Sequence, residues 1–219
     1  MEDIDLALDT ASHARREAPP DPPPASGPLA GDPTAIGVPT FVVGSIALGL
    51  VLVGFVPPTA VGASIAIILA ATGVGQGVAA LWAAALGQTA VAGVFGVFAG
   101  FWLSYAALVL GLTHGWYGIT PDAAVSTQGL FLISWLVTIV VLTLSTLRLP
   151  AAFTLLFALI DLALALVMLG TLSGAAGLVK AGGFVVFAFV LVGLYLFFNT
   201  ASLATGGKGL PLGNPLQRS

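Results

Sequence analysis

Residues 73 to 105 read GVGQGVAALWAAALGQTAVAGVFGVFAGFWLSY and form two apolar segments joined by a short turn, without one charged side chain. Gly73 and Gly77 are four residues apart, and so are Gly96 and Gly100, which places each pair on one helix face. Glycines at this spacing let neighbouring helix backbones approach closely in lipid. The stretch therefore predicts helices that pack against one another inside a membrane.

The composition of the whole chain agrees with this interpretation. Hydrophobic residues make up 58% of its 219 residues and charged residues only 7%, whereas a typical soluble domain has about 25% charged residues. Between Asp32 and Arg148, Asp122 is the only acidic or basic residue. Such a chain cannot form a water-soluble surface, and a polytopic protein of the lipid bilayer is expected. The absence of cysteine excludes disulfides, thiol catalysis and iron–sulfur clusters.

Residues 1 to 33 differ from the rest, because they hold seven of the nine acidic residues and half of the 14 prolines. A segment of this composition buries too little apolar surface to fold. We therefore expect a disordered cytoplasmic tail, with a polyproline ligand for a partner protein as the alternative. Its acidity argues against nucleic acid as a partner. No apolar run follows Met1, so the first span is expected to be an uncleaved anchor.

Six spans of about 20 apolar residues follow, each long enough to cross roughly 30 Å of hydrocarbon as a helix. They cover residues 36–55, 59–82, 90–110, 130–147, 151–170 and 178–202. The fold class is therefore an all-α membrane protein of six transmembrane helices. Its membrane domain covers residues 34–204, and a cytoplasmic C-terminal tail covers residues 205–219.

Six crossings place both termini on the same side of the membrane. That side would hold Arg15, Arg16, Arg148, Lys208 and Arg218, and the opposite side only Lys180. Lys and Arg are enriched in cytoplasmic loops. We therefore expect a multi-pass protein of the cell membrane with both termini in the cytoplasm.

Asp161 lies about eleven residues into the fifth span, hence about 16 Å along the helix and near the membrane midplane. An ionised aspartate costs about 2.5 to 3.5 kcal/mol at that depth, so this side chain should face the bundle interior or a wet cavity. Two interpretations stay open: proton coupling, or a neutral aspartate that fixes helix packing through a hydrogen bond. Gln76 presents the same choice, because its amide can line a pore or bind across helices.

Neither His13 nor His114 lies in a span. This excludes a histidine-ligated metal or haem within the bilayer, and also a Ser–His dyad there. We therefore expect no enzyme activity, no cofactor and no metal. The interior would offer small residues, hydroxyls and aromatic rings, a lining that selects a small solute by size and desolvation.

Several blocks resemble the acetate uptake transporters, a family of small six-helix permeases and channels for acetate and succinate. In chain order these blocks are GDPTAIGVPTF (31–41), GVGQGVAALWAAALGQT (73–89), VFGVFAGFWLSYA (94–106), STLRLP (145–150) and LPLGNP (210–215). The resemblance implies a six-helix protomer with its own pore, assembly as a homo-hexamer, and passage of acetate or a similar short-chain carboxylate.

The family's constriction of Phe, Tyr and Leu would fall on Phe41, Phe98 and Ile160 in this chain. Phe98 takes the place of a tyrosine, so a hydroxyl that could bind the carboxylate is missing. Asp161 stands beside the constriction position, where the family more often has a neutral residue. These three aromatic and aliphatic positions are the expected gate, and Asp161 is the hypothesis for proton coupling.

Substrate contact is expected from Gln76 and from the helix amino end near Pro33, where unpaired N–H groups favour anions. The preceding residue is Asp32 instead of the family's asparagine. An anionic Asp32 at a pore mouth would repel a carboxylate unless it caps the helix.

Two functions of other classes remain as alternatives. One is a channel for a neutral small solute, which differs from the first hypothesis in whether transport depends on substrate charge. The other is a non-transporting membrane scaffold whose Pro-rich tail recruits a partner. Deletion of residues 1 to 30 would leave the flux of a transporter intact but abolish the activity of a scaffold.

Overall fold

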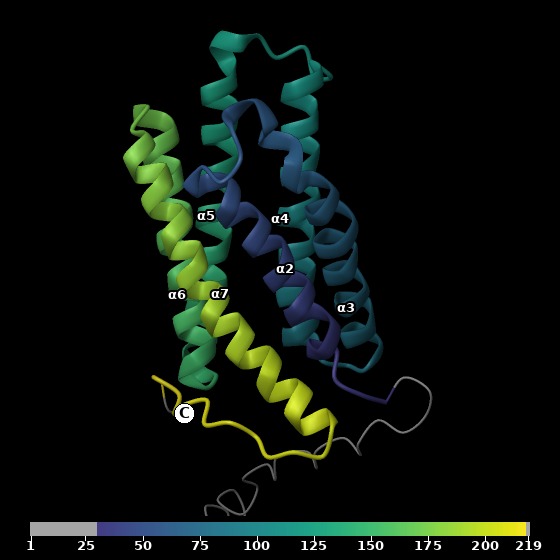
Figure 1. Ribbon diagram of the computed structural model, residues 1–219. Coiled ribbons are helices and arrows are strands. Elements are labelled where there is room, and N and C mark those ends of the chain that lie inside the picture. Colours follow the sequence, from purple (N-terminus) through teal and green to yellow (C-terminus); the bar gives the residue numbers. More distant parts are fainter. Residues whose placement is uncertain (1–29, 218–219) are drawn as a thin grey trace, which may run out of the picture. The chain divides into compact units, whose positions relative to one another are not determined.

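The structure, a computed structural model, describes residues 30–217. Within that range six helical spans are long and apolar enough to cross a membrane, and they run alternately in opposite directions (Figure 1). Their helices are α2 (Thr34–Val53), α3 (Val74–Ala85), α4 (Thr89–His114), α5 (Ala124–Ser145), α6 (Ala151–Ser173) and α7 (Ala176–Ala204). The prediction of an all-α protein with six membrane-spanning helices is confirmed. Most of the predicted N-terminal tail lies outside the described residues.

The second span is less regular than its sequence predicts. It begins with a 3-10 segment at Pro58–Ser64 and passes through a π-helix at Ile67–Gly73 before α3 begins. Thr72, in the last turn of this π-helix, is fully buried. A β-carbon on Gly44 of α2 would overlap the Thr72 side chain. The wider π-turn thus lies where α2 approaches the second span most closely.

In each of the two predicted glycine pairs, only one glycine lies close to a side chain of another helix. A β-carbon on Gly73 would lie 2.9 Å from Leu103 Cγ, and one on Gly100 would lie 3.2 Å from a ring carbon of Trp135. A β-carbon on Gly77 would meet no atom of the described chain within 4 Å, and one on Gly96 only a methyl group at 3.9 Å. Residues four apart share a helix face, but tertiary packing decides which of them meets a neighbour.

The fourth span begins earlier than predicted. The sequence places residues 111–128 in a loop, whereas α4 extends to His114 and α5 already begins at Ala124. The polar side chains at the start of α5 bond to their own helix: Thr127 Oγ1 donates to Ala123 O at 2.9 Å, and Gln128 Nε2 donates to Ala124 O at 3.3 Å. Their hydrogen bonds are satisfied within the helix, so their polarity does not end it.

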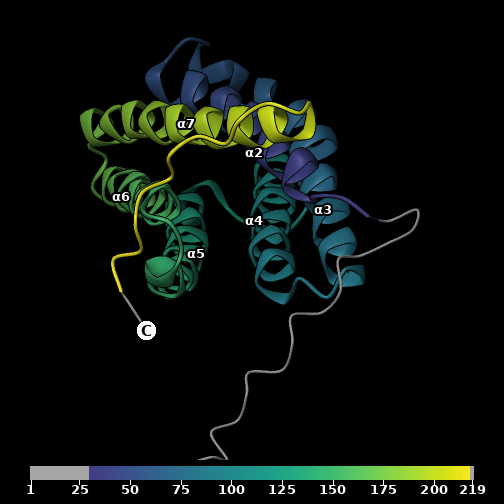
Figure 2. The same ribbon diagram turned by 90° about the horizontal axis from the view of Figure 1, so that it is seen from below.

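The six helices pack as three pairs, and one of these pairs contacts the other two. Seen from below in Figure 2, α5 and α6 lie on one side, α3 and α4 lie on the other, and α2 and α7 pack together beside both pairs. Small residues allow this packing: a β-carbon on Gly183 of α7 would lie 2.9 Å from Leu52 Cβ of α2, and one on Gly182 would lie 2.7 Å from a Val167 methyl group of α6. This arrangement leaves the cavity described below between the pairs.

The predicted C-terminal tail is bound to the helices at the end where α6 begins. Leu212 O accepts a hydrogen bond from Ala152 N at 2.9 Å, and Gln217 N donates to Leu147 O at 2.9 Å. Figure 1 shows this segment in yellow, running from the end of α7 to the base of α5 and α6. Residues 205–217 are therefore a strap across one end of the bundle.

Candidate functional site

A cavity of about 220 Å³ lies inside the bundle and is lined by five helices, α2, α4, α5, α6 and α7. Its lining extends over twelve residues, or eleven steps along the helix, from Phe41 to Leu52 on α2 and from Ile160 to Thr171 on α6. At 1.5 Å per helical residue, this corresponds to a length of about 16 Å. The cavity is therefore elongated along the direction in which the helices cross the membrane.

The three positions of the expected gate all line this cavity. The ring centroids of Phe41 and Phe98 are 5.3 Å apart, with the planes at 70°. Phe189 lies 5.6 Å from Phe41, and Phe157 lies 5.7 Å from Phe98. The Phe41–Phe98 and Phe98–Phe157 pairs meet edge to face, and such contacts contribute about 0.5 to 1.5 kcal/mol each beyond area burial. These rings and Ile160 thus close one end of the cavity, and their role as a gate stays a prediction.

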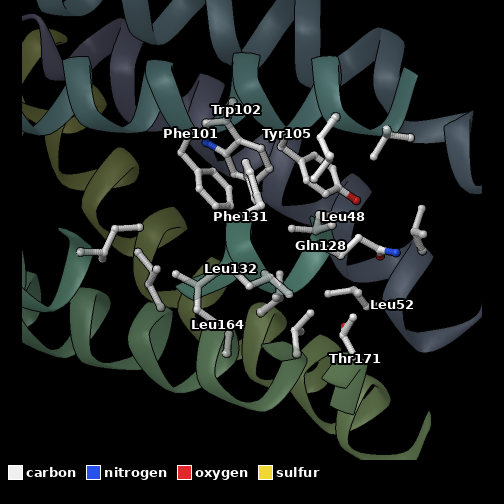
Figure 3. A pocket seen from close by; sticks show the side chains of 18 of the residues that line it. Leu48, Leu52, Phe101, Trp102, Tyr105, Gln128, Phe131, Leu132, Leu164 and Thr171 are labelled. Carbon is white, nitrogen blue, oxygen red and sulfur yellow. The ribbon is translucent and has the colours of Figure 1, made fainter. Parts of the chain in front are cut away.

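Polar side chains in the lining are few. Besides the indole N–H of Trp102, described below, they are the hydroxyl of Tyr105 on α4, the amide of Gln128 on α5 and the hydroxyl of Thr171 on α6. In Figure 3 these three lie toward one side of the cavity, and Phe101 and Leu164 lie toward the other. Gln128 is eleven residues from Ile139 on α5, and Thr171 is eleven residues from Ile160 on α6, at the aromatic end. The two ends of the cavity therefore differ in polarity.

Trp102 is the polar group of the lining that sequence reasoning missed. It is only 2% exposed, and its Nε1–H has no hydrogen-bond partner among residues 30–217. Its ring lies 6.3 Å from that of Phe41, one helical turn beyond Phe98. A buried donor without a partner costs about 1 to 3 kcal/mol. The sequence places Trp102 among other aromatic residues, and only the tertiary contacts reveal that its N–H is unused.

Gln76 makes the hydrogen bond between helices that one of its two predicted roles requires. Its side chain is 1% exposed, and its Nε2 donates to Gly37 O of α2 at 3.1 Å. In the described part of the chain its Oε1 has no partner. Gln76 does not belong to the lining of the cavity. The structure therefore gives it a hydrogen bond between α3 and α2, and its contact with substrate stays a prediction.

Pro33 also lies apart from the cavity, at the buried start of α2. The backbone N–H of Thr34, next along the chain, donates to Asp32 Oδ1 at 2.9 Å. The Asp32 carboxylate thus caps this helix end and occupies one of the donors that were expected to bind an anion. Thr34 Oγ1 also lies 3.2 Å from Thr200 Oγ1 of α7, so this end of α2 is packed against its neighbour.

Asp161 is half-buried between α5 and α6. Its Oδ2 accepts a hydrogen bond of 2.7 Å from Thr143 Oγ1, which also lies 2.9 Å from Ile139 O. Its Oδ1 is buried and has no partner among the residues that the structure describes. Ile160 lines the cavity, but Asp161 is turned by about 100° from it toward α5. The carboxyl group is therefore beside the cavity and not in it.

Hydroxyl groups continue from Asp161 along the contact between α5 and α6. Thr146 Oγ1 donates to Thr143 O at 2.7 Å, and Thr154 Oγ1 donates to Thr146 O at 2.9 Å. Thr146 and Thr154 are both buried, and they lie near the end of the bundle where the strap crosses. A series of polar groups thus connects the half-buried carboxyl with that end. Among the described residues, no cluster of three metal-ligating side chains occurs.

Comparisons with known proteins identify relatives of this chain. The profile of the GPR1/FUN34/yaaH family matches residues 16–208. Acetate permease A of Emericella nidulans is 30% identical over 168 residues, which cover 70% of this chain and 55% of that protein. Accumulation of dyads protein 2 of Saccharomyces cerevisiae is 29% identical over 150 residues, which cover 65% of this chain and 50% of that protein. The chain thus spans about half the length of these curated relatives.

A solved structure has the same fold. The bacterial acetate channel SatP superposes with a TM-score of 0.74 at 23% identity, covering 84% of this chain and 99% of that chain. The family profile extends over most of the chain, and the resemblance to the acetate uptake transporters drawn from the sequence is confirmed. The chain belongs to the GPR1/FUN34/yaaH family.

Proposed function

We propose that this protein carries acetate or a similar short-chain monocarboxylate across a membrane, through a route inside the single protomer. The observation that carries the proposal is the elongated cavity that ends at Phe41, Phe98 and Ile160, within six membrane-spanning helices. The names of two relatives, an acetate permease and a bacterial acetate channel, support acetate as the substrate.

In this proposal the aromatic rings act as a gate that strips water from the solute. The Phe41 and Phe98 rings are in contact, so passage requires that side chains move. Trp102 stands immediately beyond them, and its N–H has no hydrogen-bond partner in the part of the chain that the structure describes. That N–H donates to the carboxyl oxygen of the substrate when the substrate reaches the rings, and it replaces one of the hydrogen bonds lost from water.

We propose further that transport is linked to protons through Asp161. A carboxylate that crosses hydrocarbon must lose its charge or be accompanied by an opposite one. Among residues 30–217, Asp161 is the acidic residue placed deep within a span, and the hydroxyls of Thr143, Thr146 and Thr154 lie between it and one end of the bundle. Because Asp161 does not line the cavity, its protonation acts on transport through the contact between α5 and α6.

The assembly and orientation belong to the same proposal. We expect a homo-hexamer in the cell membrane with both termini in the cytoplasm. The distribution of Lys and Arg supports this orientation, since Arg148 precedes α6 and Lys208 follows α7 at one end of the bundle, whereas Lys180 lies near the start of α7 at the other. Cross-linking in membranes tests the assembly, and labelling of a cysteine introduced after Gln217 tests the side on which that terminus lies.

The experiment that tests the proposed function is uptake of labelled acetate into proteoliposomes, with empty liposomes as the control. We expect uptake that saturates and that excess unlabelled acetate competes away. Acetamide, a neutral molecule of the same shape, separates a carboxylate transporter from a channel for neutral solutes. If acetamide crosses as well as acetate, the neutral-solute alternative holds. If neither crosses at any pH, the transport proposal is wrong.

A further inference from the structure

We propose that the cavity binds unbranched monocarboxylic acids of about six to eight carbons more tightly than it binds acetate, with the carboxyl group toward the side on which Tyr105, Gln128 and Thr171 lie. This inference rests on the proposed function, because it takes the cavity to be part of the route of the substrate. It concerns the length of the alkyl chain that the cavity accommodates.

The volume of the cavity carries the first step. An apolar cavity of about 150 Å³ holds a benzene molecule, which has six carbon atoms. By the same measure a cavity of about 220 Å³ holds about nine non-hydrogen atoms, as in a seven-carbon acid. Acetate, with two carbons and two oxygens, would leave more than half of this space without partner atoms, and those dispersion contacts would be lost.

The shape and lining of the cavity carry the second step. The lining extends over about 16 Å of helix and is mostly apolar, with Leu132 and Leu164 on α5 and α6. An extended alkyl chain fits a long, apolar space of this kind better than a ring or a branched chain does. The aromatic residues Phe41 and Phe189 close the far end, which limits the length of the chain.

The polar groups carry the third step, because three polar side chains on one side of the cavity, against the single indole N–H of Trp102 near the aromatic end, give the ligand a direction. Tyr105 and Thr171 offer hydroxyls, and Gln128 offers an amide that, among the described residues, is held by one long hydrogen bond of 3.3 Å to its own helix. They lie on one side of the cavity in Figure 3. No basic side chain lines the cavity among the described residues, so the carboxyl group is held by hydrogen bonds and not by an ion pair.

Isothermal titration of the purified full chain in detergent tests the inference, with acetate, butyrate, hexanoate, octanoate and dodecanoate as the probes. Each buried methylene contributes about 0.8 kcal/mol, so we expect affinity to rise about fourfold per carbon and to stop rising near eight carbons. Equal affinity for acetate and hexanoate would overturn the inference. A rise that continues to dodecanoate would overturn it as well, because it would report partition into detergent.

A pair of leucine variants identifies the site of binding. Leu164 is 8% exposed and lines the cavity, whereas Leu162 on the same helix is 48% exposed and does not. Leu164→Phe adds about three carbon atoms to the cavity, so the preferred acid should become about three carbons shorter. Leu162→Phe should leave the length preference unchanged. If both variants keep the wild-type preference, the acids bind elsewhere and the inference is wrong.

Acetate uptake measured on the same preparation separates this inference from the proposed function. Uptake of acetate without any preference for longer acids would refute the inference alone. The absence of both uptake and binding would refute the proposed function. If Leu164→Phe does not fold, the titration of the wild-type chain with acids of increasing length still tests the inference.

Discussion

Asp161→Asn is the substitution that tests proton linkage most directly. Asparagine has nearly the same size and shape as aspartate, and its amide oxygen can accept the 2.7 Å hydrogen bond from Thr143 Oγ1. The amide nitrogen would take the place of Oδ1, which is buried without a partner among the described residues. The variant therefore keeps the contact between α5 and α6 but cannot take up or release a proton.

The effect on stability follows from these two oxygens. A hydrogen bond to a charged group contributes about 1.5 to 3 kcal/mol and one to a neutral group about 0.5 to 1.5, so the variant loses about 1 to 1.5 kcal/mol if Asp161 is ionised. It also removes the cost of about 2.5 to 3.5 kcal/mol of a charge at that depth. The amide N–H groups that replace Oδ1 have no acceptor among the described residues and cost about 1 to 3 kcal/mol. The net change then lies between about 2 kcal/mol of destabilisation and about 1.5 kcal/mol of stabilisation. If Asp161 is neutral, stability changes by less than about 1 kcal/mol.

The effect on transport is a loss of pH dependence. One linked proton changes the driving free energy by about 1.4 kcal/mol, or the accumulation ratio at equilibrium by tenfold, for each unit of pH difference across the membrane. We expect the ratio of acetate uptake at pH 6 to that at pH 8 to fall in Asp161→Asn to the ratio that acetate protonation in solution alone produces. The assay is uptake into proteoliposomes, and empty liposomes correct for acetic acid that crosses the lipid unaided.

Thr138→Val is the matched control for this experiment. Thr138 is an exposed residue of α5, and its hydroxyl bonds to Ser134 O of its own helix at 2.9 Å. Its removal should leave the pH profile unchanged. A wild-type pH profile in Asp161→Asn would refute proton coupling through this residue. A loss of more than about 2 kcal/mol of stability would refute the view that Oδ1 has no partner.

Three further predictions concern the gate, the free indole N–H and the helix contacts. Phe98→Ala should lower stability by about 3 to 5 kcal/mol in thermal unfolding. It should also admit larger carboxylates in competition uptake, and unchanged selectivity would count against the gate. Trp102→Phe should weaken acetate binding about tenfold in titrations, because a donor to a charged group is lost, and binding as strong as in the wild type would exclude the proposed contact. Gly44→Ala should lower the stability in thermal unfolding by about 1 to 3 kcal/mol, because the new methyl group would overlap the buried Thr72. Gly77→Ala should be neutral or slightly stabilising, because its methyl group would meet no atom of the described chain within 4 Å. Equal effects of the two substitutions would refute the helix contacts described above.

The number and type of the helices could be predicted because they depend on local composition. Water cannot hydrogen-bond the backbone inside the bilayer, so an apolar run of sufficient length has to be a helix. The ends of these helices also have local causes: α2, α4 and α6 each stop at a glycine with a positive φ, namely Gly54 at 86°, Gly115 at 68° and Gly174 at 69°. The early start of α5 was missed because the hydrogen bonds of Thr127 and Gln128 within the helix offset their polarity.

The candidate site could be predicted only in part. The family resemblance pointed to Phe41, Phe98 and Ile160, and the structure places all three around one cavity. Composition pointed to Gln76 and Asp161 as unusual residues. It could not say that Gln76 bonds to α2, or that Asp161 faces α5 and stands beside the cavity. Trp102 carried no signal at all, because an unused N–H is a property of its surroundings.

Hydropathy along the chain was thus sufficient for the membrane class, the six helices and their alternation, since each depends on the transfer of one segment from water to lipid. Which side chains share a cavity depends on the rotation of each helix about its axis. That rotation results from close contacts between distant segments, such as Gly44 with Thr72 and Gly183 with Leu52. In lipid, every face of such a helix is apolar, so hydropathy does not distinguish an inward face from an outward one, and packing does.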